Sequence, residues 1–406
     1  MKFAVIGDTH FGYNFSGKRK NESFVNGFEA FELAISENVD FIIQVGDFFD
    51  ERLPKPEVIS PVLKKLSEYN KVIPKVKLTE TIDDKNKSKL QNKKIPPIIV
   101  ILGDHDRRPR DFVNPVQLLY DANLIHYIQS ETEVIEVNDK RIAIHGFSNV
   151  PHQNAKEIFL KRNFQKIPDL KNILLMHQNF KEMIPNLPED ILSISDIPSF
   201  YDASFLGHIH WKKEFRNKIS NNPIIFTGST VATQMTKQES KMKKGIFIVD
   251  VKDELIINFK ELKSPRVLKY INLNIDNMKP SEINVKINES IKEIIEYHNH
   301  PLIPMIRIKL DGILHDGFLP SDINFKTINK KFEDKLKINI DKSKIKSKKL
   351  EEKTKLIRKA KNDKKNINQL GIEILSKKMN IRDIQKIEEI FMLLKTNNLD
   401  EVLNKI

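Results

Sequence analysis

Five short motifs in the first 210 residues carry acidic or histidine side chains. Carboxylate oxygens and imidazole nitrogens together suit divalent first-row metals such as Mn²⁺, Fe²⁺ or Zn²⁺. Seven of these side chains are candidate ligands: Asp8, His10, Asp47, Asp104, His177, His208 and His210. Seven ligands are too many for one ion and suit two, which can share a bridging carboxylate and clamp an in-line displacement at phosphorus. The motifs are Gly7-Asp8-Thr9-His10, Gly46-Asp47, Gly103-Asp104-His105-Asp106, Met176-His177-Gln178 and Gly207-His208-Ile209-His210.

Each motif directly follows a predicted strand. A lone Asp-x-His or His-x-His is more often structural, but five motifs that each follow a strand favour a common site. In α/β sheets, ligands gather beyond the carboxyl ends of the strands. Alternating strand and helix patterns therefore predict an α/β fold with these loops converging. Strands are expected at Lys2–Ile6, Val39–Val45, Ile98–Leu102, 141–145, 173–176, 204–206, 224–227 and 245–251, and helices at 24–35 and 56–69.

The composition excludes some classes of protein and of functional site. The 406 residues carry a formal charge of +13, which suggests a polyanionic partner, although a lysine-rich surface alone would give the same balance. The absence of cysteine excludes disulfides, thiolate zinc sites and cysteine nucleophiles. The start of the chain lacks the apolar segment of a signal peptide, and no run approaches the length of a membrane span. We expect a cytoplasmic location.

Composition and periodicity also predict the domain organisation. Residues 1–262 form the α/β domain, in which the lysine-rich residues 77–95 are expected to be a solvated surface insertion. Residues 263–340 read as a small β-α-β-α-β domain. Residues 341–365 contain twelve Lys or Arg and four Asp or Glu, which predicts a basic flexible linker. Residues 366–406 regain helical periodicity.

The motif series resembles the calcineurin-like metallophosphoesterase family over residues 1–260. The resemblance implies a four-layer α/β/β/α sandwich with two central sheets and two bound metals. It also implies that His105 donates a proton to the leaving oxygen or stabilises the transition state, while a water or hydroxide at the metals attacks. One metal would take Asp8, His10, Asp47 and His210, and the other would take Asp47, Asp104, His177 and His208, with Asp47 bridging.

Within this family, one branch is more similar: the archaeal nucleases of double-strand break repair. The similarity rests on the opening MKFAVIGDTHFG, on Gly46-Asp47-Phe48-Phe49 and on Leu206-Gly207-His208-Ile209-His210, with further matches at 227–229 and 244–247. It implies two Mn²⁺ ions, 3′-to-5′ exonuclease activity on duplex DNA ends and endonuclease activity on single strands. It also implies a DNA-binding capping domain at 263–340 and a nucleoid-associated homodimer. That dimer would form a heterotetramer with a coiled-coil ABC-type ATPase docked on the C-terminal helices.

Two positions depart from the pattern. Asp104 stands where the family has Asn, so three ligand carboxylates against two dications leave +1 rather than +2. Asp50 stands where archaeal relatives often have His or Asn, a position that would help to aim duplex DNA. The sequence therefore predicts that Asp104→Asn retains or raises nuclease activity.

Other features have two interpretations each. Arg107, Arg108 and Arg110 either hold DNA phosphates near the metals or belong to a solvated loop. The basic run 341–365 either contacts DNA or is only a tether. The apolar face at 370–395 is expected to bind a groove on a partner. Five apolar residues could form a dimer seam, although core packing is the favoured interpretation: Val58, Val62, Leu66, Val116 and Leu119. The histidines outside the motifs are expected to be structural or surface residues: His126, His145, His152, His298, His300 and His315.

Three functions remain open at this point. The first is a manganese-dependent DNA repair nuclease that acts with an ATPase. The second is a metallophosphatase or nucleotidase on small molecules, which would leave the small domain and the basic run without a role. The third is a DNA-end-binding scaffold with catalysis weakened through Asp104, against which the full set of histidines and His105 argue.

Overall fold

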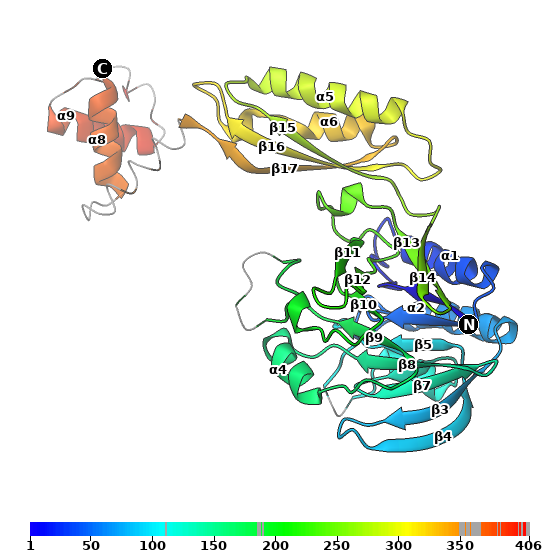
Figure 1. Ribbon diagram of the computed structural model, residues 1–406. Helices are drawn as coiled ribbons and strands as arrows, with labels where there is room; N and C mark the ends of the chain where they lie inside the picture. The colour runs from blue at the N-terminus through cyan, green and yellow to red at the C-terminus, as the bar shows by residue number, and fades with distance from the viewer. Residues whose placement is uncertain are drawn as a thin grey trace. The chain divides into compact units, whose positions relative to one another are not determined.

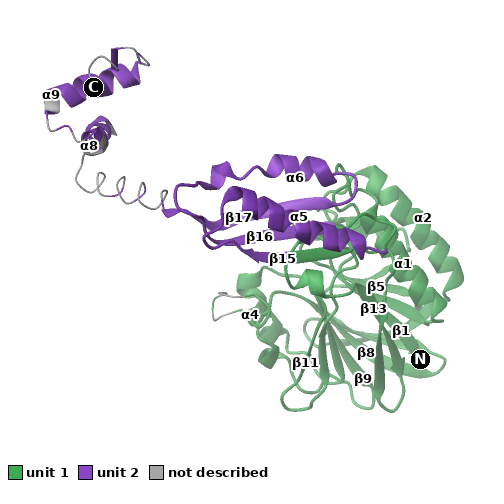
Figure 2. Cartoon of the chain, turned by 90° about the horizontal axis from the view of Figure 1, so that it is seen from above, with its two compact units in different colours: residues 1–270, 300–304 green, residues 271–299, 305–406 purple. Residues whose placement is uncertain are grey.

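The computed structural model describes residues 1–109, 112–184, 188, 191–348, 354, 358, 367–379, 381, 383–396, 398 and 401–402. The chain divides into two compact units (Figure 2). The first unit contains residues 1–270 and 300–304, and the second contains residues 271–299 and 305–406. Each unit is described by itself.

A six-stranded sheet in the first unit has the order β14-β13-β1-β2-β5-β6 (Figure 1). Its strands β1, β2, β5 and β6 are parallel neighbours, and β13 and β14 add antiparallel strands at one side. The bounds are β1 (Lys2–Ile6), β2 (Phe41–Val45), β5 (Ile98–Ile101), β6 (His126–Ile128), β13 (Gly245–Val251) and β14 (Leu255–Glu261).

An eight-stranded sheet has the order β11-β12-β10-β9-β8-β7-β3-β4. Strands β8, β9, β10 and β12 run parallel in its centre, and antiparallel strands flank them. The bounds are β3 (Val76–Ile82), β4 (Ser88–Ile95), β7 (Thr132–Val137), β8 (Lys140–Phe147), β9 (Lys171–His177), β10 (Ala203–Gly207), β11 (Lys213–Arg216) and β12 (Pro223–Phe226).

The two sheets face each other, and helices cover their outer faces. Strand β1 shows why: Phe3 and Val5 join the core between the sheets, whereas Ala4 and Ile6 join the core under the helices. Helix α4 covers the outer face of the eight-stranded sheet with Phe159. The expected four-layer sandwich is therefore confirmed. The helices are α1 (Glu22–Ser36), α2 (Pro56–Val72) and α3 (Pro115–Asp121) on one side and α4 (His152–Arg162) on the other, with short 3₁₀ turns at η1 (Ile194–Asp196) and η2 (Glu239–Lys241).

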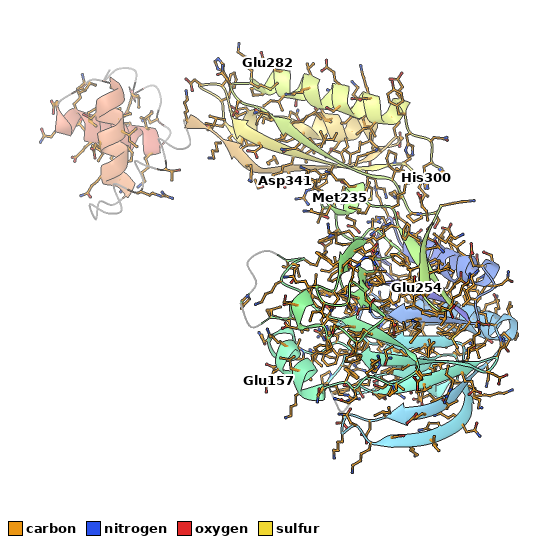
Figure 3. The ribbon with its side chains drawn as sticks, viewed as in Figure 1. Glu157, Met235, Glu254, Glu282, His300 and Asp341 are labelled. Atoms are coloured by element: carbon orange, nitrogen blue, oxygen red, sulfur yellow. The ribbon has the colours of Figure 1, made fainter. Side chains whose placement is uncertain are left out.

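The second unit contains a three-stranded sheet of order β15-β16-β17 with two helices. Strands β16 and β17 are parallel, and an ion pair of 2.7 Å joins Arg307 Nη2 to Asp341 Oδ2. Figure 3 labels Asp341 on this sheet. Strand β17 continues to Lys346, so the first residues of the basic run 341–365 are strand residues. The elements are β15 (Leu268–Asn274), α5 (Pro280–Glu296), β16 (Met305–Ile313), η3 (Pro320–Asp322), α6 (Phe325–Phe332) and β17 (Lys337–Lys346).

Two helices follow near the C-terminus, α8 (Ile367–Met379) and α9 (Ile384–Lys395). The Asp383 side chain caps α9 by accepting hydrogen bonds from the backbone amides of Gln385 and Lys386. Ile387 and Ile390 are fully buried, so α9 already covers part of its apolar face within the chain. Among the described helices, none is both long and apolar enough to cross a membrane.

Residues 77–95 differ from the expected surface insertion, because they are part of the sheet. They complete β3 and form β4, the last strand of the eight-stranded sheet. An edge strand needs only backbone hydrogen bonds to one neighbour, so a polar, lysine-rich sequence can form it without an apolar face. The expectation of solvation holds for β4, whose residues are exposed except for Gln91 and Ile95.

Candidate metal centre

The first cluster of metal-binding side chains lies at the carboxyl ends of β1 and β2 and in the loop after β10. Asp8, His10 and Asp47 are buried and His210 is nearly so, and each of the four offers a ligand atom within 4.8 Å of the others. The Nε2 atoms of His10 and His210 are 3.1 Å apart. Buried groups of this kind need a partner, and two imidazole nitrogens that face each other suit a shared cation.

A second cluster shares Asp47 with the first. It combines Asp47 with Asp104, His177 and His208, again with ligand atoms within 4.8 Å of one another. Asp104 Oδ1 lies 2.9 Å from His208 Nδ1 and 3.3 Å from His177 Nε2. The structure thus brings all seven candidate ligands together, with Asp47 in both clusters.

Backbone conformation allows the loops to approach so closely. Gly46 has a φ of +84°, and a Cβ there would lie 2.3 Å from His177 Nδ1. A Cβ at Gly103 would lie 2.0 Å from Asp47 Oδ1. Glycine is therefore required at both places, because any side chain would push apart two ligand-bearing loops.

Three of the candidate ligands themselves adopt the left-handed backbone conformation. The φ angles are 45° at His10, 48° at Asp47 and 75° at His208. Such angles are uncommon outside glycine and cost roughly 1–2 kcal/mol per residue. The surrounding hydrogen bonds hold them in place: the His10 amide donates to Asp47 O at 3.0 Å, and the His208 amide donates to Asp8 Oδ2 at 3.0 Å.

Asp106 supports the site without being part of either cluster. Its buried carboxylate accepts hydrogen bonds from the amides of Phe48, Phe49 and Gly103 at 3.0, 3.1 and 3.0 Å. It therefore locks the loop after β2 to the loop after β5. Asp106 belongs to the third motif, but no role was predicted for it from the sequence. Its position two residues after a candidate ligand is the feature of the sequence that could have identified it as a supporting residue.

Hydrogen bonds from neighbouring side chains also hold His210 in place. The buried Lys244 ammonium donates to His210 O at 2.7 Å and forms an ion pair of 2.7 Å with Glu239 Oε1. Burial lowers the pKa of Lys244 from its ordinary value, against the raising effect of Glu239. The Thr233 hydroxyl contacts His210 Nδ1, which leaves Nε2 to face the cluster. Nothing in the spacing of the motifs pointed to these residues.

The electrostatics of the clusters follow from their burial and charge. Burial raises the pKa of Asp8 to about 6, despite the opposing effect of His177. Burial alone would lower the pKa of His10, but contact with Asp50 and the charges of Asp47 and Asp8 raise it to about 9. Imidazolium protons thus balance the carboxylates, and divalent cations would take the place of those protons.

The shared carboxylate and the second cluster show the same balance. Burial opposes ionisation of Asp47 and Asp104, yet the neighbouring histidines, His177 foremost, hold the pKa of both carboxyls below the ordinary value. Burial likewise opposes the charged form of His177, but Asp47 and Asp8 raise its pKa well above the ordinary value. Both carboxylates are therefore ionised and ready to bind a cation.

His105 lies beside the clusters with a different exposure. Its side chain is 41% exposed, and its Nε2 atom lies 3.9 Å from Asp104 Oδ2. Its Nδ1 contacts the backbone oxygen of Asp50, and its amide donates to Asp47 Oδ1 at 3.0 Å. Because Nδ1–H is held by a carbonyl, Nε2 is the atom available to exchange a proton with a substrate.

The Asp50 carboxylate lies next to the first cluster. Its Oδ1 atom is 3.2 Å from His10 Nδ1, on the opposite side of the ring from the Nε2 atom that faces His210. Asp50, His10 and His105 also form a third group of close metal-binding atoms. A carboxylate behind a metal-binding histidine fixes the tautomer and the orientation of its ring.

The three arginines considered as DNA contacts have different surroundings. Arg107 lines a cavity of about 790 Å³ beside Leu102 and Asn149, whereas Arg108 donates to Val113 O at 2.9 Å. Arg110 lies outside the described residues. Sequence reasoning missed Arg52, whose Nε donates to Asp104 O at 3.3 Å.

Core packing explains the residues considered as a dimer seam. They all join the core between the helices and the six-stranded sheet: Val58, Val62, Leu66, Val116 and Leu119. Of the histidines outside the motifs, His126 pairs with Glu133 at 2.7 Å, and His145 Nε2 donates to Asn172 Oδ1 at 3.0 Å. Burial lowers the pKa of His145 to about 4, so it is neutral in the core.

The donor set fits divalent cations. Each cluster offers two carboxylates and two imidazoles, the mixture that suits first-row metals rather than the all-oxygen set preferred by Ca²⁺. The ring atoms turned away from the clusters are held by protein acceptors, as His177 Nδ1 shows with its 2.8 Å contact to Val45 O. This second layer of contacts is what ligating histidines require.

Comparison with known proteins finds similar sequences and structures. The chain is 25% identical over 324 residues to "DNA double-strand break repair protein Mre11" of Sulfolobus acidocaldarius, covering 77% of this chain and 75% of that protein. The protein of the same name from Sulfurisphaera tokodaii is 27% identical, with 76% and 72% covered. A dimetal phosphatase structure from Danio rerio aligns at a TM-score of 0.36 and 11% identity, covering 64% and 96%.

The family model decides the relationship. The model of the calcineurin-like phosphoesterase matches residues 1–212, which is just over half of the chain. These residues include all five motifs and therefore both clusters. The fold implies a divalent metal site, and the chain supplies Asp and His clusters compatible with one. The chain belongs to the calcineurin-like phosphoesterase family and is a metal-dependent hydrolase of phosphoesters.

Proposed function

We propose that this chain is the nuclease subunit of a DNA double-strand break repair complex and cleaves phosphodiester bonds with two Mn²⁺ ions. The observation that carries the proposal is the pair of Asp/His clusters that share Asp47 beside the exposed ring of His105. The relatives that match about three quarters of the chain bear the name of such a repair protein.

The two clusters would hold one cation each. Asp8, His10 and His210 would hold one ion and Asp104, His177 and His208 the other, and Asp47, which belongs to both clusters, would contribute to each. Bound cations would supply Lewis-acid polarisation of the phosphate and a water of lowered pKa as the nucleophile. The buried carboxylates and histidines would hold the cations in fixed positions, and the cations would in turn position the anionic phosphate of the substrate.

His105 is the proton-handling residue of the proposal. Its Nδ1 is held by the Asp50 carbonyl, and its half-exposed ring leaves Nε2 free to donate a proton to the leaving oxygen. Asp104 Oδ2 lies 3.9 Å from this Nε2 atom. Arg52 and Arg107 lie on the loops around this position and are candidates for holding flanking phosphates.

The finer parts of the proposal concern substrates and partners. Duplex ends would be degraded from 3′ to 5′ and single strands would be cut internally, at the nucleoid. The protein would act as a homodimer that joins a coiled-coil ABC-type ATPase through α8 and α9. Leu53 lies just before α2, Leu118 lies on α3, and both are exposed apolar side chains. They support a contact between two copies of the chain.

One experiment separates this function from its alternatives. Labelled duplex and single-stranded DNA with Mn²⁺ are incubated in parallel with p-nitrophenyl phosphate, using wild type, His105→Ala and His152→Ala. The last variant is a matched control, because His152 is exposed on α4 away from both clusters. We expect DNA degradation that is lost by about 10²–10⁴-fold in His105→Ala and kept in His152→Ala.

The other outcomes would assign a different function. Turnover of the monoester without DNA cleavage would identify a small-molecule phosphatase. DNA binding without cleavage by wild type would identify a scaffold whose catalysis is weakened at Asp104. Equal loss in both histidine variants would show that His105 acts through stability and not through proton transfer.

A further inference from the structure

The hairpin formed by β3 and β4 presents a cationic surface that the proposed chemistry does not use. Between residues 85 and 94 the chain has five lysines and no acidic residue. All five are exposed, and β4 is the last strand of its sheet. We refer to these residues as the hairpin lysines: Lys85, Lys87, Lys89, Lys93 and Lys94.

The hairpin lysines differ from the lysine on the neighbouring strand. Lys77 on β3 forms an ion pair of 2.7 Å with Glu136 of β7. Within the part of the chain that the structure describes, none of the hairpin lysines forms a salt bridge. The Asp83 carboxylate at the tip is already used, because it accepts the amides of Lys85 and Lys87 at 2.9 and 2.8 Å. The charge of Asp83 also acts on Lys85 and Lys87, whereas no carboxylate among the described residues pairs with Lys89, Lys93 or Lys94.

The tip of the hairpin is fixed rather than free. The buried Arg162 of α4 donates from Nη1 to Asn86 Oδ1 at 2.7 Å and from Nη2 to Ile82 O at 3.3 Å. Its Nε donates to Ser130 O at 2.7 Å, which ties the tip to the turn between β6 and β7. A surface that is held in position before binding loses less entropy when a ligand arrives.

The tip also borders the loop of the third metal motif. Lys85 and Arg107 line the same cavity of about 790 Å³. Leu102, which directly precedes Gly103 and Asp104, forms part of its wall, as does Asn149, which donates to His177 O at 3.2 Å. The hairpin lysines thus begin at the edge of the candidate metal centre and continue along the outer strand of the sheet.

We infer that the β3–β4 hairpin is a second DNA-contact surface, which binds phosphates of the substrate strand beyond the metal centre. The inference rests on the proposed nuclease function and names where the flanking DNA lies. A polyanion is the partner that matches five exposed lysines without a salt bridge, and their neutralisation would release counterions from the DNA. The competing explanation is that lysines on an edge strand only prevent sheets of two molecules from pairing.

The test compares two triple variants of equal charge change. Lys87→Gln, Lys89→Gln and Lys93→Gln remove three hairpin lysines. Lys140→Gln, at the start of β8, and Lys218→Gln and Lys252→Gln, in turns, remove three exposed lysines elsewhere on the same unit. Binding of a blunt-ended duplex and of a single strand is measured over a range of salt concentrations. The hairpin variant should lower the slope of log K against log salt by about 2–3 for the duplex, and the control should not.

Turnover separates contact from chemistry. In Mn²⁺, the hairpin variant should raise KM for DNA with little change in kcat, and it should hydrolyse bis(p-nitrophenyl) phosphate as wild type does. Hydrogen exchange should slow at residues 85–94 when DNA is added to wild type. Circular dichroism of both variants checks that the sheet is intact.

Each outcome bears on one of the two proposals. Unchanged DNA affinity and salt slope in the hairpin variant would overturn the second surface, and self-association of that variant would establish edge protection instead. If wild type neither binds nor cleaves DNA but hydrolyses the small diester, the nuclease function itself fails. Equal weakening in the hairpin and control variants would show a general charge effect and would also overturn the inference.

Discussion

The two halves of the candidate metal centre differ in their exposure. In the first cluster, Asp8, His10 and Asp47 are buried and the side chain of His210 is only 12% exposed. In the second cluster, Asp104 is 35% exposed and His208 is 22% exposed. The departure from the family pattern, Asp104, therefore lies in the half that meets solvent and substrate. A charge change is tolerated where water can screen it and is costly where protein surrounds it.

The largest effect is expected from the residue that both halves share. Asp47→Asn should remove one charge from each cluster and reduce DNA cleavage by about a thousandfold, since charge stabilisation by a metal is worth several kcal/mol. Calorimetry with Mn²⁺ should show that both binding events are weakened. Loss of one event alone would contradict the bridging role of Asp47.

Asp8→Asn tests the buried half. The Asp8 carboxylate accepts the His208 amide and is fully enclosed, so an amide there removes charge without access to water. We expect Mn²⁺ affinity to fall by about a hundredfold at one of two sites. The matched change at Asp104 is the control, and equal effects of the two substitutions would break the comparison of the halves.

The pH dependence of metal binding probes the protons held by the buried half. The pKa of His10 is about 9, so its ring keeps a proton in the metal-free protein below that pH. A cation must displace this proton, and affinity should rise by about tenfold per pH unit for each proton released, until about pH 9. Calorimetry in buffers of different ionisation enthalpy measures the number released. Affinity that does not change with pH would show that His10 is neutral.

The smallest effect is expected at Asp104, in the more exposed second cluster. Asp104→Asn restores the net charge of +2 implied for the family pattern, so manganese-dependent turnover should be retained or raised by a few-fold. The amide oxygen still binds a cation, and the phosphate path is less negative. Steady-state cleavage of single-stranded DNA measures the change. A large loss of turnover would show that the carboxylate is required in this chain.

The sequence predicted the centre of the fold better than its edges. Strands such as 2–6 and 245–251 are buried on both faces, and their continuous apolar runs matched the structure to the residue. Strands β4 and β11 are edge strands with polar residues, so apolar periodicity did not reveal them.

The candidate site was visible for a related reason. Every proposed ligand follows a strand of one of the two sheets, and short sequence motifs therefore carry the whole constellation. The supports were not visible, because they act across long separations in the chain. Asp106 contacts a loop 57 and 58 residues earlier, and Lys244 contacts His210 across 34 residues. Such pairings depend on tertiary packing and leave no local pattern.

The left-handed backbone at His10, Asp47 and His208 has a consequence for laboratory evolution. Glycine would adopt these φ angles without steric cost, so a library selected only for thermal tolerance should accumulate glycine at these three positions. The same library selected for cleavage should reject it. The two selections would diverge at these positions, which makes a deep mutational scan under both pressures a direct map of where this protein gives up stability for chemistry.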